Sequence, residues 1–127
     1  MAHQFQKHYT RDEARELLPE IRQWLKRIKH VQAELHKFEK RLTGLMAPGC
    51  DLGGDLVNQW IRAVADLGAV FLEFQRREIQ VKDVDRGLVD FPAMMGGKEV
   101  FLCWEQDDED IEFWHDLDAG YAGRERL

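Results

Sequence analysis

The sequence predicts an α+β fold in which a long antiparallel helical hairpin precedes a small antiparallel sheet of three or four strands. Apolar residues recur at steps of three and four over residues 10–45 and again over 55–78, which is the period of an amphipathic helix. A stretch rich in Gly and Pro separates these two segments. Residues 79–127 instead alternate apolar and polar residues between turn signals spaced about ten residues apart. The 127 residues suit a single domain.

The first predicted helix begins at a capping box, in which the Thr10 hydroxyl and the Glu13 carboxylate each accept a free backbone amide. Pro19 lies inside the pattern and predicts either a kink or a separate short helix before it. Residues 1–9 are polar, and this segment is expected to fray at its start. A helix over residues 10–45 is roughly 50 Å long. Its expected buried seam consists of Ala14, Leu17, Ile21, Trp24, Ile28, Val31, Leu35, Phe38, Leu42 and Leu45.

The second predicted helix follows a breaker at residues 46–54 and carries a wide apolar stripe, which indicates more than one neighbour. Its heptad positions are Val57, Trp60, Val64, Leu67, Phe71 and Phe74, with Leu56, Ile61, Val70 and Leu72 beside them. Gly68 costs ~1 kcal/mol relative to Ala in a helix, which predicts close packing at that position. The first helix extends past what the second helix and a small sheet can cover. We therefore predict a homodimer through the helices, with two hairpins forming a four-helix bundle.

The β segment over residues 79–127 contains four apolar runs that predict strands. They are Ile79–Val84, Leu88–Phe91, Val100–Trp104 and Ile111–His115. Turns are expected at Asp85–Gly87 and at Gly96–Lys98, an acidic loop at 105–112, and a C-terminal turn after it. In the last strand, Phe113 and His115 point to one face of the sheet and Trp114 to the other.

The net charge of −6 argues against a nucleic-acid-binding protein, which needs a basic face. No apolar segment resembles a signal peptide or approaches the ~18 residues of a membrane span, so we expect a cytoplasmic protein with no membrane partner. Cys50 and Cys103 share no paired motif, and in that reducing compartment both are expected as free thiols.

The charge is distributed unevenly along the chain. Residues 1–45 hold 10 Lys and Arg against 6 Asp and Glu, whereas residues 85–127 hold 4 against 12. The first segment is therefore at +4 and the last at −8. Opposite charges orient contacts between segments. The acidic end could thus lie against the basic helix, in the same chain or in a second one. Two separately solvated faces are the alternative.

Four segments carry a resemblance to a known family. They are YTRDEARELLPEI at 9–21, GLVDFPA at 87–93, EVFLCW at 99–104 and IEFWHDLDAGYAGR at 111–124. With these motifs the whole chain resembles the uncharacterised bacterial family called domain of unknown function 2203. Members of that family usually have a Leu-Gly-Glu turn after the LCW strand, and this chain has the acidic run 105–110 there. The resemblance implies the fold and its boundaries, and it implies no activity.

The strongest candidate for chemistry is a divalent-metal site at His115, Asp116 and Asp118, since imidazole and carboxylates are common metal ligands. Ligands that adjacent strands could add are Asp90, Cys103 and Glu105. No HExxH motif, CxxC pair or EF-hand loop supports a particular ion. In the alternative interpretation, His115 is a half-buried residue of the sheet that hydrogen-bonds a neighbour, and the carboxylates cap a turn.

A small-ligand site is the related hypothesis, formed by Trp104, Trp114, His115 and Arg124. The two Trp residues either belong to the core or floor a pocket, and Arg124 suits an anionic group. An enzyme could use His115 polarised by Asp118 as an acid–base pair. The chain contains no serine, which excludes a Ser-His-Asp triad, and Cys103 is expected to be a small buried residue. No catalytic residue is assigned, and the prediction is a non-catalytic homodimeric assembly protein with ligand or metal binding as the alternative.

Overall fold

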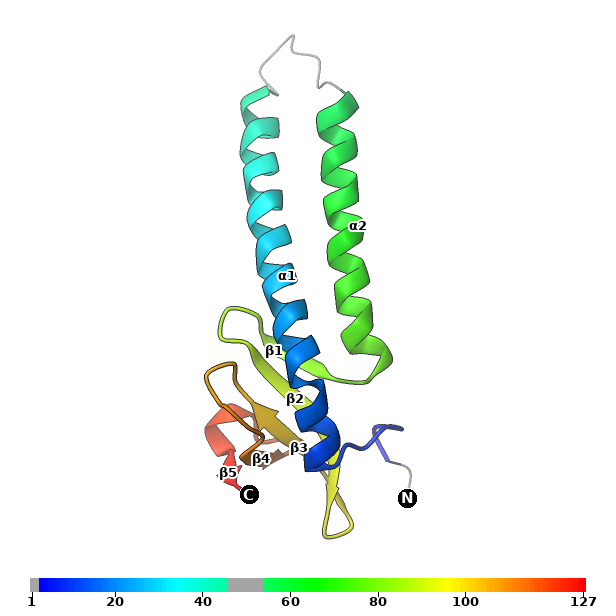
Figure 1. Cartoon of the computed structure of the whole chain (residues 1–127), viewed down its shortest axis with the longest axis vertical. Coiled ribbons are helices and arrows are strands. Elements are labelled where there is room, and N and C mark those ends of the chain that lie inside the picture. The colour runs from blue at the N-terminus through cyan, green and yellow to red at the C-terminus, as the bar shows by residue number, and fades with distance from the viewer. Residues whose placement is uncertain (1–2, 46–53) are drawn as a thin grey trace.

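The computed structural model describes residues 3–45 and 54–127, and it contains the predicted helical hairpin followed by an antiparallel sheet (Figure 1). Helices α1 (Arg11–Leu45) and α2 (Gly54–Arg76) lie side by side, and the C-terminal half of α1 projects well beyond the sheet. Within the two described ranges, neither helix has the length and apolar content that crossing a membrane requires. The predicted reversal at 46–54, with Cys50, lies outside the described residues except for Gly54.

The sheet has five antiparallel strands in chain order, whereas three or four were predicted. They are β1 (Gln80–Asp83), β2 (Leu88–Met95), β3 (Lys98–Trp104), β4 (Phe113–Asp116) and β5 (Glu125–Arg126), and a short 3-10 helix η1 (Tyr121–Gly123) precedes β5. The sequence pattern missed β5 because this edge strand has only two residues and both are charged. It is held by its pairing with Phe113 and Trp114 of β4.

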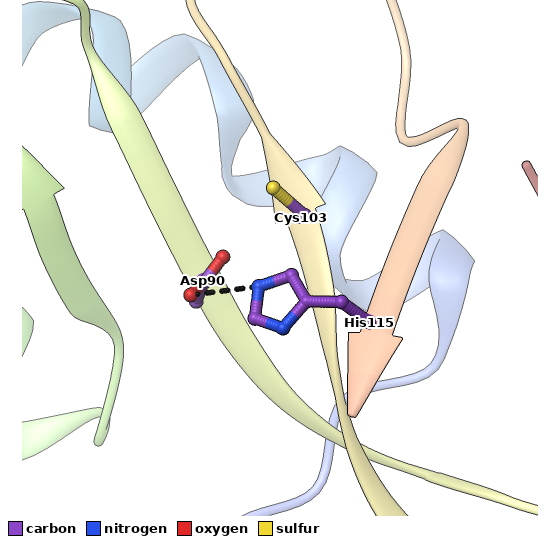
Figure 2. Close-up of side chains that lie close together, drawn as sticks. All are labelled: Asp90, Cys103 and His115. Carbon is purple, nitrogen blue, oxygen red and sulfur yellow. Dashed lines mark hydrogen bonds and ion pairs between the residues drawn. The ribbon is translucent and has the colours of Figure 1, made fainter. Parts of the chain in front are cut away.

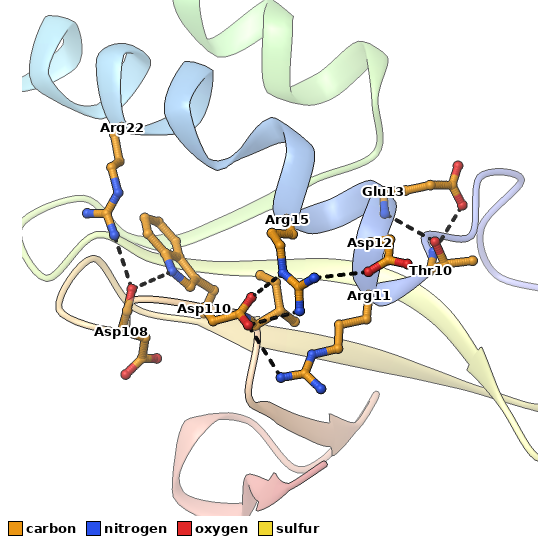
Figure 3. Close-up of polar contacts among 10 residues, drawn as sticks. Thr10, Arg11, Asp12, Glu13, Arg15, Arg22, Asp108 and Asp110 are labelled. Carbon is orange, nitrogen blue, oxygen red and sulfur yellow. Dashed lines mark hydrogen bonds and ion pairs between the residues drawn. The ribbon is translucent and has the colours of Figure 1, made fainter.

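Helix α1 begins at the predicted capping box (Figure 3). The Glu13 amide donates to the Thr10 hydroxyl at 3.1 Å, and the Thr10 amide donates to the Glu13 carboxylate at 3.1 Å. The helix then runs unbroken through Pro19, so the residues before Pro19 do not form a separate helix. Pro19 and Arg15, which lies four residues before it, are both exposed. Water can therefore replace the hydrogen bond that the proline ring removes from the Arg15 carbonyl.

Helix α1 packs against both α2 and the sheet, so it buries a wider face than the single predicted seam. Leu18 and Leu25, which that seam omitted, are 5% and 2% exposed, whereas Leu17 and Trp24 are only partly buried. Predicted residues that are buried are Ala14, Ile21, Ile28 and Val31. After Val31, no described side chain of α1 is buried. The packed core thus lies at the sheet end of the hairpin.

Helix α2 has an uncovered apolar face, which we call the open α2 stripe. It consists of the exposed residues Ile61, Val64, Ala65, Gly68 and Leu72, with the half-buried Val57 at one end. Ile61, Val64 and Leu72 are 52%, 42% and 41% exposed. A Cβ atom built on Gly68 would have nothing within 4 Å. The prediction of close packing at Gly68 is therefore wrong within the described residues, because Gly68 lies on the face that points away from α1.

The sheet has an inner face toward α1 and an outer face on the opposite side, as strand alternation requires. The inner face forms one core cluster with the buried residues of α1. Its members on β2 and β3 are Val89, Phe91, Ala93, Val100, Leu102 and Trp104. The residues between them therefore lie on the outer face, which includes Asp90, Phe101 and Cys103.

The acidic loop packs against the basic side of α1 in the same chain, which confirms that these opposite charges meet (Figure 3). Arg15 donates to both carboxylate oxygens of Asp110, at 2.7 and 2.9 Å. Arg22 donates to the main-chain carbonyls of Gln106 and Asp108, at 2.8 and 3.1 Å. Hydrogen bonds from Arg15 and from the Ile111 amide lower the pKa of Asp110. The acidic loop is therefore held against α1 by these hydrogen bonds and by the Arg15–Asp110 ion pair.

Residues 3–9 lie against the sheet, and the fraying predicted for the start of this segment falls partly on residues 1 and 2, outside the described residues. The amides of Gln4 and Phe5 donate to the Glu99 carboxylate at 2.7 and 3.0 Å, and those of Gln6 and Lys7 donate to Glu78 at 3.0 and 2.8 Å. His8 adds a 2.9 Å contact to Glu99. Glu78 itself has a left-handed backbone, with φ of 57°, at the end of α2. Two carboxylates thus satisfy four consecutive amides, a contact that polarity alone does not predict.

Candidate metal centre

Three neighbouring strands place Asp90, Cys103 and His115 together on the outer face of the sheet (Figure 2). Asp90 of β2 pairs directly with Cys103 of β3 in the antiparallel register. His115 of β4 pairs with Phe101, two residues before Cys103 on β3, so its ring reaches across toward the Asp90–Cys103 pair. The exposed fractions are 2% for Asp90, 1% for Cys103 and 2% for His115. A buried carboxylate, thiol and imidazole therefore converge in one small volume.

The hydrogen bonds of His115 indicate where its protons lie. Nδ1 is 2.7 Å from the main-chain carbonyl of Asp116, which can only accept, so Nδ1 carries a proton and donates it. Nε2 is 3.1 Å from Oδ2 of Asp90. One further proton is shared in that contact, either on the imidazole or on the carboxyl group. Burial raises the pKa of Asp90, and the nearby His115 opposes this rise.

The other two features of the cluster are an Asp90 oxygen that has no hydrogen-bond partner among the described residues and a Cys103 thiol that carries no charge. Oδ1 of Asp90 is buried and has no hydrogen-bond partner among the described residues. A buried polar atom without a partner costs about 1–3 kcal/mol. Burial and the Asp90 carboxylate raise the pKa of the Cys103 thiol to about 12. The thiol is therefore protonated at neutral pH and is a poor nucleophile, because the thiolate is the reactive form.

The ligand atoms of these three residues all lie within 4.8 Å of one another. Around a tetrahedral zinc ion, N, O and S ligands lie roughly 3.3–3.5 Å apart, given bonds of about 2.0–2.3 Å. The side chains would have to draw together by about 1 Å or slightly more, which small χ rotations can supply. The Nδ1–H bond to a main-chain carbonyl is a common outer-shell contact of a metal-binding histidine, because it fixes the tautomer and aims Nε2 at the ion. The residues present therefore fit a divalent ion.

A cavity of about 290 Å³ lies next to the cluster on the outer face. Asp90 and His115 form part of its wall, and Lys82 and Asp118 contribute the other charged groups. The remaining lining residues are Leu88, Phe101, Leu117, Ala119, Gly120 and Tyr121. Cys103 does not reach this cavity. The cluster is thus buried by the protein on one side and borders a small, mostly apolar cavity on the other.

The three metal ligands that the local motif predicted, His115, Asp116 and Asp118, do not converge on one point in the structure. His115 is in the cluster, but Asp116 contributes only its main-chain carbonyl, and its carboxylate pairs with Lys98 at 2.6 Å. Asp118 is exposed and lines the cavity, beyond hydrogen-bonding contact with His115 among the described interactions. Glu105 pairs with Arg86 at 2.9 Å.

The predicted ligand-binding residues are also spread over both faces of the sheet. Trp104 is buried on the inner face, where its indole donates to the Asp108 carbonyl at 3.0 Å and Arg22 stacks on the ring. Trp114 packs partly buried against the same core. Arg124 lies on the outer side, 3.2 Å from Asp108 and 3.8 Å above the Phe113 ring. Of the four predicted residues, only His115 lines the cavity.

Asp90 and Cys103 were predicted only as additions from adjacent strands, yet they complete the cluster. One signal for Asp90 was present in the sequence: it is the single charged residue in the run Leu88–Ala93, whose residues are all buried in the structure. A charge in a buried run needs a partner. Identifying that partner required the strand register, which the sequence pattern does not give.

No curated protein and no solved structure matches this chain. A family model described as "Uncharacterized conserved protein (DUF2203)" matches residues 7–127. That range includes both helices, all five strands and the three residues of the cluster. The chain therefore belongs to the DUF2203 family of uncharacterised conserved proteins.

Proposed function

We propose that this protein binds one divalent metal ion through Asp90, Cys103 and His115. The observation that carries the proposal is the convergence of three buried ligand atoms within 4.8 Å, one of which belongs to a carboxylate with an unpartnered oxygen. An ion would satisfy that oxygen, which otherwise destabilises the fold. Asp116 and Asp118 are not part of this ligand set.

Charge balance favours a divalent ion at this position. Without an ion, Asp90 and His115 share one proton and the Cys103 thiol keeps its own, so the buried cluster is neutral overall. Replacing both protons with a divalent ion leaves a carboxylate, a thiolate and a neutral imidazole, which again total zero. A buried net charge would cost several kcal/mol, and this exchange avoids it.

The ligand types favour zinc over magnesium or calcium. Thiolate and imidazole are soft or borderline ligands that suit zinc and its spectroscopic substitute cobalt(II), whereas magnesium and calcium prefer sites made only of oxygen.

A zinc titration of untagged, chelator-treated protein tests this proposal by calorimetry and native mass spectrometry. We expect one zinc ion per chain, and we expect His115→Ala and Cys103→Ser each to weaken binding by at least about 100-fold. The matched control is His8→Ala, because His8 makes another close histidine–carboxylate contact, at 2.9 Å from Glu99. Unchanged zinc binding in His115→Ala and Cys103→Ser, or loss in His8→Ala alone, would contradict the proposal.

We propose as a second function that the protein forms a homodimer through the open α2 stripe. The observation behind this is an apolar helix face that the described chain leaves uncovered, with Ile61 52% exposed. Antiparallel pairing of two α2 helices about an axis between Val64 and Ala65 is self-complementary, as a two-fold interface requires. It sets Ile61 of one copy against Gly68 of the other, so that a large side chain meets an open position.

Charged residues beside the open α2 stripe are compatible with the same antiparallel pairing of two α2 helices. Arg62 has no ion pair among the described residues, and the two-fold axis would bring it next to Asp66 of the second copy, whose carboxylate also pairs with Arg27 of its own chain at 2.9 Å. Two hairpins joined in this way would form a four-helix arrangement.

Light scattering of wild-type and Gly68→Leu protein at micromolar concentration tests the dimer. We expect a two-chain mass for the wild type and a one-chain mass for Gly68→Leu, since leucine would fill the position that receives Ile61. In a monomer a Cβ atom at this position has nothing within 4 Å, and the substitution removes a helix-destabilising glycine, so it should stabilise the fold by up to ~1 kcal/mol. A one-chain mass for the wild type overturns the dimer, and so does an unchanged two-chain mass for Gly68→Leu.

We also infer that the protein works in the cytoplasm, because a metal-binding Cys103 has to remain a reduced thiol. Recovery of the native protein mainly outside the cytosolic fraction would contradict this.

A further inference from the structure

We infer that the ion keeps one coordination position open toward the cavity, and that a short-chain carboxylate monoanion binds there with its charge near Lys82. This inference rests on the proposed metal site and names the ligand class for it. Zinc sites with three protein ligands commonly leave a fourth position to water or to a bound molecule.

The arrangement of the three ligands determines which side is open. Asp90 and His115 line the cavity, whereas Cys103 lies outside its wall. An ion held by all three residues would have the sulfur on the protein side and the cavity on the other. Strands and the segment that follows β4 close the remaining directions, since all three ligand residues are at most 2% exposed. A fourth ligand can therefore approach only from the cavity.

Lys82 gives the cavity its preference for an anion. Its ammonium group lies 5.3 Å from the centre of the Phe101 ring, and both residues line the cavity. No carboxylate of the described residues lies within the 4.0 Å of an ion pair from this ammonium. Because the metal-loaded cluster is neutral, a single negative charge on the ligand would be balanced by Lys82. Asp118, exposed on the cavity wall, would repel a dianion.

The size and polarity of the cavity define the rest of the ligand. A volume of about 290 Å³ is at the lower limit for a small-molecule site. Apart from the charged groups, the wall consists mainly of apolar side chains, including Leu88, Leu117 and Tyr121. A carboxylate with a short hydrocarbon chain fits both the volume and the wall, because its head can bind the ion while its tail contacts these side chains.

Cobalt(II)-loaded full-length protein titrated with propionate tests this inference. Thiolate ligation gives a sulfur-to-cobalt charge-transfer band, and the d–d bands report the fourth ligand. We expect propionate to shift the d–d bands without removing the charge-transfer band. Propionamide, which has the same size and no charge, should have no effect at equal concentration. In Lys82→Met we expect propionate to bind about three- to tenfold more weakly, while Lys26→Met, an exposed lysine on α1, should bind as the wild type does.

The outcomes distinguish the two proposals. If the charge-transfer band is present and propionate does not shift the d–d bands, the open coordination position is overturned but the metal site is still supported. Equal effects of propionate and propionamide, or unchanged propionate affinity in Lys82→Met, overturn the assignment of an anionic ligand at Lys82. Absence of the charge-transfer band overturns the metal site and this inference together.

Discussion

Both ring nitrogens of His115 make hydrogen-bonding contacts, so the contributions of Asp90 and His115 to stability depend on each other. The Asp116 carbonyl fixes the Nδ1 proton, so Nε2 can meet Asp90 only by sharing one proton with it or by binding a cation in its place. The sequence identified His115 as the residue to test. It did not identify Asp90 as its partner, because the two residues are 25 positions apart and meet only in the folded sheet.

A double-mutant cycle measures this coupling in the metal-free protein. We expect Asp90→Ala and His115→Ala each to lower the free energy of unfolding by about 1–3 kcal/mol, since each leaves a buried polar partner unsatisfied. The double variant should lose less than the sum of the two losses, with a coupling of about 1–2 kcal/mol. Urea unfolding provides the values, and strictly additive losses would show that the 3.1 Å contact contributes nothing.

Glu99 provides a test of the N-terminal segment. Burial tends to raise the pKa of Glu99, but hydrogen bonds from His8 and from the Gln4 and Phe5 amides lower it, to about 2 from an ordinary 4.5. A lowered pKa in the folded state stabilises the fold above pH 4.5, and this stabilisation is lost as the pH falls toward 2.

We therefore expect wild-type protein to lose more stability between pH 4.5 and pH 2 than the Glu99→Gln variant does. Urea titrations at several pH values measure the difference, and Glu109→Gln, in the acidic loop and with no resolved hydrogen bond in the described part of the chain, is the control. Parallel pH profiles for wild type and Glu99→Gln would mean that the carboxylate does not hold residues 3–9.

At the scale of elements, the sequence predicted those features that depend on local chemistry. The capping box at Thr10, the hairpin turn at Gly96–Gly97 and the long helix are all present, and both glycines have positive φ values of 58° and 78°. The predictions that were wrong concerned the packing of one element against another, which local sequence does not determine. The single seam on α1 omitted Leu18 and Leu25 because α1 packs against two elements, and Gly68 was assigned a close neighbour that the described residues do not supply.

Gly87 shows how a turn between strands positions the acidic loop. Its φ is +64°, and a Cβ atom there would lie 2.7 Å from the Gln106 Cβ. We expect Gly87→Ala to cost about 1–3 kcal/mol, from backbone strain and from displacement of the loop. Gly96→Ala is the matched control, because Gly96 has a similar φ of +58° and open space around it. Equal losses in thermal or urea unfolding would show that the contact with Gln106 has no effect.

At the scale of the whole molecule, the core and the candidate site share the sheet end of the chain, while much of the hairpin extends away from it (Figure 1). The sequence predicted this division, since the heptad pattern ran beyond what a small sheet could cover. It could not give the position of the site, because convergence of Asp90, Cys103 and His115 depends on the register of three strands and on which face carries α1.

This division predicts that a shortened hairpin keeps the metal site. Replacing residues 35–60 with a short Gly-rich linker removes a part of α1 in which no described side chain is buried, together with the first turns of α2 and the buried Leu56. We expect the shortened protein to bind cobalt(II) within about twofold of the wild-type affinity, although it should melt at a lower temperature. Loss of cobalt binding in a variant whose circular dichroism still shows a folded sheet would mean that the hairpin supports the site directly.

Anomalous diffraction from crystals grown with zinc is the sharpest test of the metal site, because it locates the ion among the candidate ligands. We predict one strong peak per chain, about 2.0–2.3 Å from a carboxylate oxygen of Asp90, Sγ of Cys103 and Nε2 of His115. A peak at His8 and Glu99 with none between the three strands would contradict the account, and so would well-ordered Asp90 and His115 side chains still sharing their 3.1 Å hydrogen bond at saturating zinc.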